Sequence, residues 1–405
     1  MNNSGQAGFR AGKVYEMFAD SKKIEQKYSR DLLRNSVQLE HITKAEVKDF
    51  PGVRFWEVDY KPDIQIKADD PSGCNFLALS GGGSNGAFGA GFLNGWTESG
   101  TRPNFKIITG ISTGGLIAPA AFLGSQTDEI IKEVYTTIEA KDIFYVQGFL
   151  GIGILSFLLG ESYASTKPLR KLIAKLVDQD ILRAVAQEYA KGRRLYIGTT
   201  NLDAQRFMIW DMGAIASSGH PNAIKLFRKV MLASASIPGI FPPVYFDVEV
   251  EGRQYREMHL DGGLVTGVFG HSSKLFADET GMSGQKFNRN LYIIKNGKLA
   301  SETYQTPRRA LQIANRSFET LMKSRTWGDF YRLYNIAKKD KIEFNYVSIP
   351  DEYKPLSKKL FNQAEMNRLF DMGFKMAKDG YEWRKKLPGA FDGKNDNEWT
   401  WTPME

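Results

Sequence analysis

Short apolar runs alternate with helical patterns along most of the chain. Runs of four to six apolar or β-branched residues indicate buried strands at residues 76–79, 105–109, 195–200, 206–210, 245–248, 291–294 and 344–349. Helical patterns occupy residues 87–93, 115–121, 127–141, 167–191 (one or two helices), 223–235, 307–338 and 363–384. Because strands and helices alternate, the chain is predicted to be an α/β protein with a largely parallel sheet, in which residues 195–210 form a hairpin-like pair.

The N-terminal part of the chain has a different pattern. Apolar positions at helical spacing among many charges predict an amphipathic helical extension at residues 13–45. Prolines and a Pro-Gly pair in residues 46–73 predict an irregular lead-in to the main domain.

A turn between two of these elements carries a possible nucleophile. Residues 110–114 read Gly-Ile-Ser-Thr-Gly, a G-x-S-x-G pattern between a predicted strand and a predicted helix. Such a pattern places the serine, here Ser112, at a strained strand-to-helix turn, with Gly110 and Gly114 avoiding clashes with the crossing chain. An ordinary tight turn with a serine at the helix N-cap is the alternative interpretation.

The preceding turn is rich in glycine. Residues 81–86 read Gly-Gly-Gly-Ser-Asn-Gly and expose backbone N–H groups that can stabilise a developing oxyanion. The same residues match the dinucleotide-binding pattern G-x-G-x-x-G. That pattern requires an acidic residue at the end of the second strand, which here ends Ile108-Thr109-Gly110. We therefore expect no nucleotide partner.

A nucleophilic serine needs a group that accepts its proton. The chain has four histidines, His41, His220, His259 and His271. His259 lies two residues before Asp261, on the same face if this segment is a strand. Asp261 precedes two glycines at the apparent end of a strand, where α/β folds place their chemistry. A plain Asp-Gly-Gly turn is the alternative.

Four motifs in this order resemble the bacterial patatin-like phospholipases. They are residues 81–86 (GGGSNG), 110–114 (GISTG), 233–244 (ASASIPGIFPPV) and 261–263 (DGG). The resemblance extends over residues 74–384 and implies a three-layer α/β/α sandwich with a mostly parallel central sheet. We expect the catalytic domain at residues 74–390, an N-terminal extension at residues 1–73 and a tail at residues 391–405.

The resemblance also implies a reaction and its residues. Ser112 would be the nucleophile and Asp261 the base, without a catalytic histidine, a metal or another cofactor. The amides of Gly82, Gly83 and Ser84 would form the oxyanion hole. The substrate would be a fatty-acyl ester of a phospholipid, cleaved through an acyl-enzyme as in phospholipases A and lysophospholipases.

Two departures from the family pattern concern substrate preference. Asn85 stands where the family commonly has Arg or Lys, and residues 264–267 (LVTG) lack the Asn that often follows the Asp-Gly-Gly motif. A non-hydrolytic lipid- or acyl-binding protein on the same fold remains a second hypothesis, which intact Ser112 and Asp261 disfavour.

Composition and charge narrow the possible partners. The single cysteine rules out an internal disulfide, and the four histidines are not spaced as a metal site. The net charge of +8 is spread along the chain, which gives little support for nucleic-acid binding. It suits an anionic lipid surface, or a solvated basic surface without a partner. Residues 1–12 lack the apolar core of a signal peptide, so we expect a cytoplasmic or peripheral membrane location.

An uncharged apolar run at residues 148–159 has two interpretations. It is too short to span a bilayer. With three glycines among large apolar residues, it suits either a buried part of the core or a lipid-facing flap at the mouth of the site.

Replacing Phe149 and Leu150 by Ser distinguishes the two interpretations. If the run is a flap, vesicle binding weakens while the melting temperature and turnover of a soluble ester stay unchanged, because the lost side chains contact only lipid. A large fall in the melting temperature would instead place the run in the core.

Overall fold

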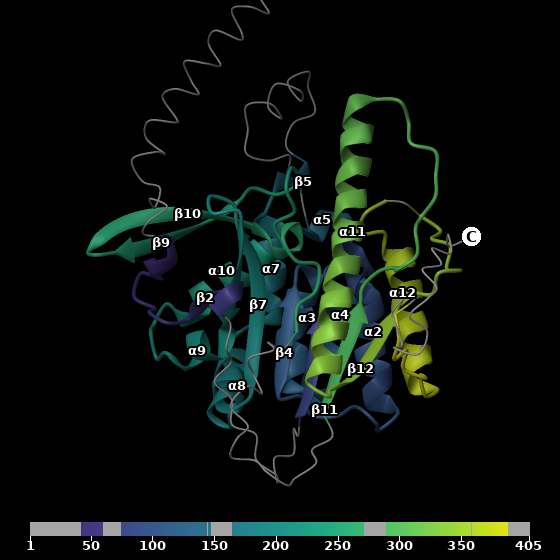
Figure 1. Cartoon of the computed structure of the whole chain (residues 1–405), viewed down its shortest axis with the longest axis horizontal. Helices are drawn as coiled ribbons and strands as arrows, with labels where there is room; N and C mark the ends of the chain where they lie inside the picture. The colour runs from purple at the N-terminus through teal and green to yellow at the C-terminus, as the bar shows by residue number, and fades with distance from the viewer. Residues whose placement is uncertain are drawn as a thin grey trace, which may run out of the picture.

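The computed structural model describes residues 42–59, 74–143, 145–146, 164–270, 289–357 and 359–387. A ten-stranded sheet forms its centre, in the order β1-β9-β10-β7-β4-β3-β11-β12, with β8 on β7 and β2 on β8 (Figure 1). Its strands are β1 (Glu46–Val47), β2 (Arg54–Trp56), β3 (Cys74–Leu79), β4 (Ile107–Ile111), β7 (Arg194–Asn201), β8 (Arg206–Asp211), β9 (Val244–Val250), β10 (Arg253–Asp261), β11 (Arg289–Lys295) and β12 (Glu343–Ser348). A separate two-stranded sheet pairs β5 (Tyr145–Val146) with β6 (Ala164–Ser165).

Helices connect most of these strands. The α-helices are α2 (Gly86–Glu98), α3 (Thr113–Leu123), α4 (Asp128–Thr137), α5 (Ala140–Ile143), α7 (Lys167–Leu176), α8 (Gln179–Ala190), α9 (Met212–Ser217), α10 (Ala223–Ser234), α11 (Ala310–Lys339) and α12 (Gln363–Lys378). Short 3₁₀ helices are η1 (Ile42–Lys44), η2 (Glu57–Asp59), η3 (Gly83–Asn85), η4 (Ser125–Thr127) and η5 (Gly262–Leu264). Among the described residues, no helix combines the length and apolar character needed to cross a bilayer.

The predicted parallel centre of the sheet is confirmed. Strands β7, β4, β3, β11 and β12 are all parallel. The predicted hairpin is also confirmed, because β8 pairs antiparallel with β7. Antiparallel strands β9 and β10 extend the sheet beyond this centre.

Helices cover both faces of the sheet, which confirms the expected three layers. Leu79, Ile108 and Ile197 belong to an apolar cluster that includes side chains of α2, α3, α4, α10 and α12. Phe330 and Leu333 of α11 pack with strand residues in a second cluster on the opposite face. Figure 1 shows α11 lying in front of the strands, with α2 and α4 behind them.

Of the one or two helices predicted at residues 167–191, the structure has two, α7 and α8, because Val177 is extended and the Asp178 side chain caps α8. One helix prediction needs correction. The closing helix ends at Lys378 rather than at residue 384. Beyond it, Arg384 pairs with Tyr346 of β12 through two backbone hydrogen bonds of 2.9 and 3.3 Å, so this segment joins the sheet edge instead.

Several expectations fall outside the described residues. These are the amphipathic pattern before residue 42, the apolar run at residues 148–159 and the tail at residues 391–405.

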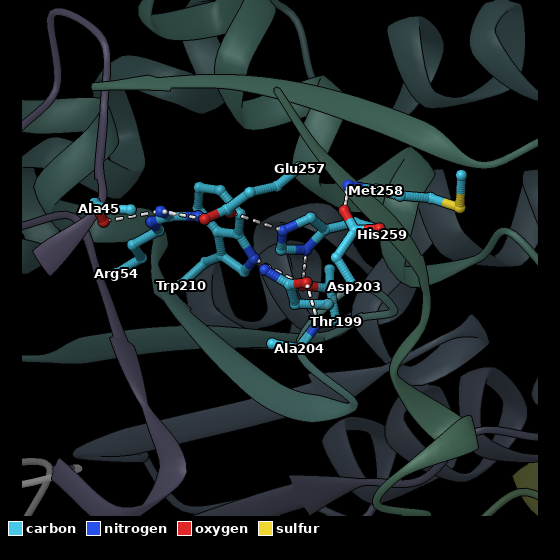
Figure 2. Close-up of polar contacts among 10 residues, drawn as sticks. Ala45, Arg54, Thr199, Asp203, Ala204, Trp210, Glu257, Met258 and His259 are labelled. Atoms are coloured by element: carbon cyan, nitrogen blue, oxygen red, sulfur yellow. Dashed lines mark hydrogen bonds and ion pairs between the residues drawn. The ribbon is translucent and has the colours of Figure 1, made fainter. Parts of the chain in front are cut away.

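The expectation of an irregular lead-in is wrong for residues 46–56. Strand β1 pairs with β9 and β2 pairs with β8, although two- and three-residue strands are too short to leave an alternating pattern in the sequence. Arg54 of β2 forms a bidentate ion pair with Glu257 of β10, and both side chains are almost fully buried (Figure 2). Arg54 also donates to the Ala45 carbonyl at 2.7 Å. The segment before residue 59 is therefore fixed to the main sheet.

Replacing Arg54 by Met should lower the free energy of unfolding by about 3–5 kcal/mol, because it leaves the buried Glu257 carboxylate without its cation. The control is Lys44→Met, which removes an exposed 3.9 Å contact with Glu251 and should cost about 1 kcal/mol or less. Urea unfolding of both variants measures the difference. Equal effects would mean that the buried pair contributes no more than the exposed one.

Candidate active site

Ser112 lies at the sharp turn between β4 and α3. Its backbone has φ 55° and ψ −126°, a strained conformation for a residue with a side chain. A Cβ atom on Gly114 would lie 2.3 Å from the Leu79 carbonyl oxygen, and one on Gly110 would lie 2.5 Å from the Gly114 carbonyl oxygen. This is the local geometry expected from a G-x-S-x-G pattern. The catalytic role of Ser112 stays a prediction.

Strand β7 brings Ser112 and Asp261 to the same point. Along one edge of β7, the N-terminal half pairs with β4. In this pairing Ile111, the last residue of β4, lies opposite Gly198. The next position on β7, Thr199, pairs with Asp261 at the end of β10, which runs in the opposite direction. Since β8 occupies the other edge of β7, the ends of β4 and β10 meet on one edge. Residues far apart in the chain thus become neighbours.

The Asp261 carboxylate is buried beside the Ser112 side chain. Burial raises its pKa to about 6, although hydrogen bonds from the Ser112 side chain and the Gly263 amide act in the opposite direction. The Gly263 amide donates to Asp261 Oδ1 at 2.8 Å. This carboxylate has its pKa close to neutral pH, as suits a group that must accept a proton and later return it.

The end of α10 supports both residues. The Ser112 amide donates to Ser234 Oγ at 2.9 Å, and the Ser234 hydroxyl donates to the Gly198 carbonyl at 2.7 Å. The Asp261 amide donates to the Ser236 carbonyl at 2.9 Å. Sequence analysis did not identify Ser234 or Ser236 as site residues, although both lie within the motif at residues 233–244.

The glycine-rich turn lies beside Ser112. Gly83 and Ser112 line the same pocket. Within the described part of the chain, no hydrogen-bond acceptor is found for the amides of Gly82, Gly83 or Ser84. They are therefore available to an oxygen atom of a ligand.

Asn296, just after β11, fixes this turn. Its side chain donates to the Ser80 carbonyl at 2.8 Å and accepts from the Gly89 amide at 3.1 Å. The backbone N–H of Asn296 donates to Ser80 Oγ at 2.9 Å. Sequence analysis gave no signal for Asn296, because its partners lie more than 200 positions earlier in the chain.

An apolar pocket of about 40 Å³ opens at Ser112. Its walls combine side chains from α3, α4, α7, α12 and the loops after α10 and before α12: Leu116, Val134, Ile138, Leu169, Leu172, Leu176, Ile237, Phe241, Phe361 and Met366. These apolar walls suit an apolar ligand group better than a charged one.

His259 belongs to a different network. Its Nδ1 lies 2.9 Å from Thr199 Oγ1, which also accepts from Trp210 Nε1, and its Nε2 lies 3.2 Å from Glu257 Oε2 (Figure 2). Burial lowers the pKa of His259, although Glu257 acts in the opposite direction. With both ring nitrogens engaged, His259 holds β10 in place and contacts neither Ser112 nor the Asp261 carboxylate through them. Among the described residues, no group of three His, Cys, Asp or Glu side chains is placed to hold a metal ion.

A strained serine beside a buried carboxylate at the carboxyl edge of a parallel sheet is typical of hydrolytic α/β enzymes. Residues 77–269 match the family model of the patatin-like phospholipases. This stretch of the chain is thus similar to a patatin-like phospholipase domain, and the similarity supports lipid hydrolase activity.

Comparison with solved structures finds distant similarities. VipD from Legionella pneumophila is 12% identical with a TM-score of 0.37, and the alignment covers 78% of this chain and 70% of VipD. The type III effector protein ExoU is 12% identical with a TM-score of 0.28, covering 76% of this chain and 54% of ExoU. No curated protein sequence matches the chain significantly.

Proposed function

We propose that this protein is a serine acyl hydrolase that cleaves fatty-acyl esters of phospholipids or lysophospholipids through a Ser112–Asp261 dyad. The observation that carries the proposal is the meeting of β4 and β10 on one edge of β7, which puts the Ser112 side chain close enough to the buried Asp261 carboxylate to lower its pKa. The family match supports the same class of substrate.

The first half of the reaction acylates Ser112. Asp261 accepts the hydroxyl proton while Ser112 Oγ attacks the ester carbonyl. The amides of Gly82, Gly83 and Ser84 stabilise the resulting oxyanion. When the tetrahedral intermediate collapses, the bond to the leaving alcohol breaks and Asp261 returns the proton to the alcohol oxygen.

Water completes the cycle. Asp261 accepts a proton from a water molecule that attacks the acyl-enzyme. When the intermediate collapses, the bond to Ser112 Oγ breaks, Asp261 returns the proton to this oxygen, and a fatty acid leaves. The acyl chain occupies the apolar pocket beside Ser112, where Leu116 and Phe241 are among the side chains that shield it from water.

Replacing Ser112 by Ala should abolish labelling by a fluorophosphonate probe and lower ester turnover by about 10⁴-fold or more, because the covalent route is lost. Asp261→Asn should have a similar effect on turnover, since its amide accepts no proton. Turnover of a soluble ester, probe labelling and circular dichroism measure the outcome.

His259→Ala is the control for this pair. It should keep most of the activity of the folded protein, because the two imidazole nitrogens contact Thr199 and Glu257 and not the dyad. A loss as large as that of Asp261→Asn, with the fold retained, would favour a triad. Near wild-type turnover by Ser112→Ala would contradict the hydrolase mechanism, and lipid binding without turnover by the wild type would favour the acyl-binding alternative.

The raised pKa of Asp261 predicts the pH dependence of activity and stability. The ionised base is required, so kcat/KM should be half-maximal near pH 6 and fall about tenfold per unit below it. The folded state binds this proton more tightly than the unfolded state, so ionised Asp261 destabilises the fold above its pKa. At pH 8, Asp261→Asn should therefore melt at a higher temperature than the wild type, and the difference should narrow below pH 6. A flat pH–rate profile between pH 5 and 8 would contradict this account.

A further inference from the structure

The N-terminal half of α11 projects beyond the sheet. The helix has 30 residues and is about 45 Å long at 1.5 Å per residue. The preceding strand β11 has seven residues and spans about 23 Å. Among the side chains of α11 that the structure describes, the buried ones belong to its second half: Thr326, Asp329, Phe330, Leu333 and Ala337. The first half stands above the strands in Figure 1, beyond the edge that carries Ser112.

Exposed apolar side chains gather at this same edge. Seven large apolar residues are exposed among those that the structure describes: Val58, Leu202, Tyr304, Ile313, Leu321, Leu356 and Leu360. Tyr304, Ile313 and Leu321 lie on the projecting half of α11 and the loop before it. Leu356 and Leu360, 72% and 50% exposed, lie in the loop that follows the carboxyl end of β12. We call residues 304–325 together with Leu356 and Leu360 the docking edge.

The docking edge is close to the proposed site. A Cβ atom on Gly263, two residues after Asp261, would lie 2.9 Å from the Met322 side chain of α11. Phe361, the residue after Leu360, lines the apolar pocket that opens at Ser112. The docking edge therefore lies near Asp261 on α11 and near the pocket at Leu360.

Basic residues dominate this part of the chain. Residues 296–325 contain six basic and two acidic side chains, which accounts for half of the net charge of +8. Both acidic side chains are paired with basic ones, Glu319 with Arg316 at 3.1 Å and Glu302 with Lys323 at 3.4 Å. Arg308 and Arg309 make no ion pair with any residue that the structure describes.

The position of these two arginines is electrostatically unfavourable in the isolated protein. They lie at the N-terminus of α11, whose first turn has no acidic residue and whose N-cap has no side-chain hydrogen bond. Cations there oppose the helix dipole. A surface of negative charge would compensate both the arginines and the helix end.

We propose that the docking edge binds the surface of an anionic phospholipid bilayer. Ile313, Leu321 and Leu356 enter the interfacial region, while Arg308 and Arg309 pair with lipid phosphates. A second copy of this chain is disfavoured as the occupant, because two such basic edges repel each other. The proposal rests on the proposed function for its substrate but concerns a surface outside the dyad.

Vesicle binding tests the docking edge. Each variant carries Ser112→Ala so that the lipid stays intact, and vesicles contain phosphatidylcholine with or without phosphatidylserine. Arg308→Ser with Arg309→Ser should weaken binding to phosphatidylserine vesicles about 10- to 30-fold. Ile313→Ser with Leu321→Ser should weaken binding to both kinds of vesicle about tenfold or more. The matched control, Lys338→Ser with Lys339→Ser, makes the same charge change at the opposite, exposed end of α11 and should change binding less than about threefold.

Three results would overturn the proposal. The first is equal vesicle binding by the arginine variant and its lysine control. The second is a lower melting temperature of the Ile313/Leu321 variant with unchanged binding, which would assign these side chains to packing within the chain. The third is self-association of the wild type that these substitutions abolish.

Turnover of a soluble ester by the same variants with Ser112 restored separates the two proposals. If the wild type binds vesicles through the docking edge but hydrolyses no ester, the hydrolase proposal fails and the docking edge stands. Ester turnover without edge-dependent vesicle binding overturns the docking edge alone.

Discussion

The register of strand β7 is the constraint on which the proposed site depends. On one edge of β7, Gly198 pairs with Ile111 of β4, and the adjacent Thr199 pairs with Asp261 of the antiparallel strand β10. Because side chains alternate along a strand, a slip of one residue in either pairing would turn the serine or the aspartate away from its partner. The Ser234 hydroxyl, bonded to the Gly198 carbonyl, and the Thr200 hydroxyl, bonded to the Asp261 carbonyl, hold the two pairings in register.

Two buried carboxylates of β10 differ because only one has a cation. Burial raises the pKa of Glu257, but His259 and Arg54 more than reverse this effect and bring the pKa to about 2. Asp261, four residues later, has hydrogen bonds but no cationic partner among the residues that the structure describes, and burial raises its pKa to about 6. The same strand therefore carries one carboxylate that is a permanent structural anion and one that exchanges its proton near neutral pH.

Local patterns predicted the parts of the fold that depend on local sequence. Short apolar runs gave the parallel strands, and the glycine–serine spacing around Ser112 gave the strained turn. Strand β10 is mostly polar and charged, so its pattern does not reveal that it pairs with β7 next to the end of β4. The ion pair of Arg54 and the hydrogen bonds of Asn296 join positions about 200 residues apart, and no local pattern encodes such contacts.

The buried Arg54–Glu257 pair also bears on which fragments of this protein can fold. The family match begins at residue 77 and ends at residue 269, so a fragment with these limits retains Glu257 but loses Arg54. It also loses α12, whose Phe370 backbone packs so closely on α2 that a Cβ atom on Gly91 would lie 2.0 Å from the Phe370 carbonyl oxygen. Such a fragment contains every proposed catalytic residue. However, it leaves the buried Glu257 carboxylate without its cation and uncovers the face of α2 that packs on α12, and both changes favour misfolding and aggregation. The physical unit of folding is thus larger than the segment that carries the family signature.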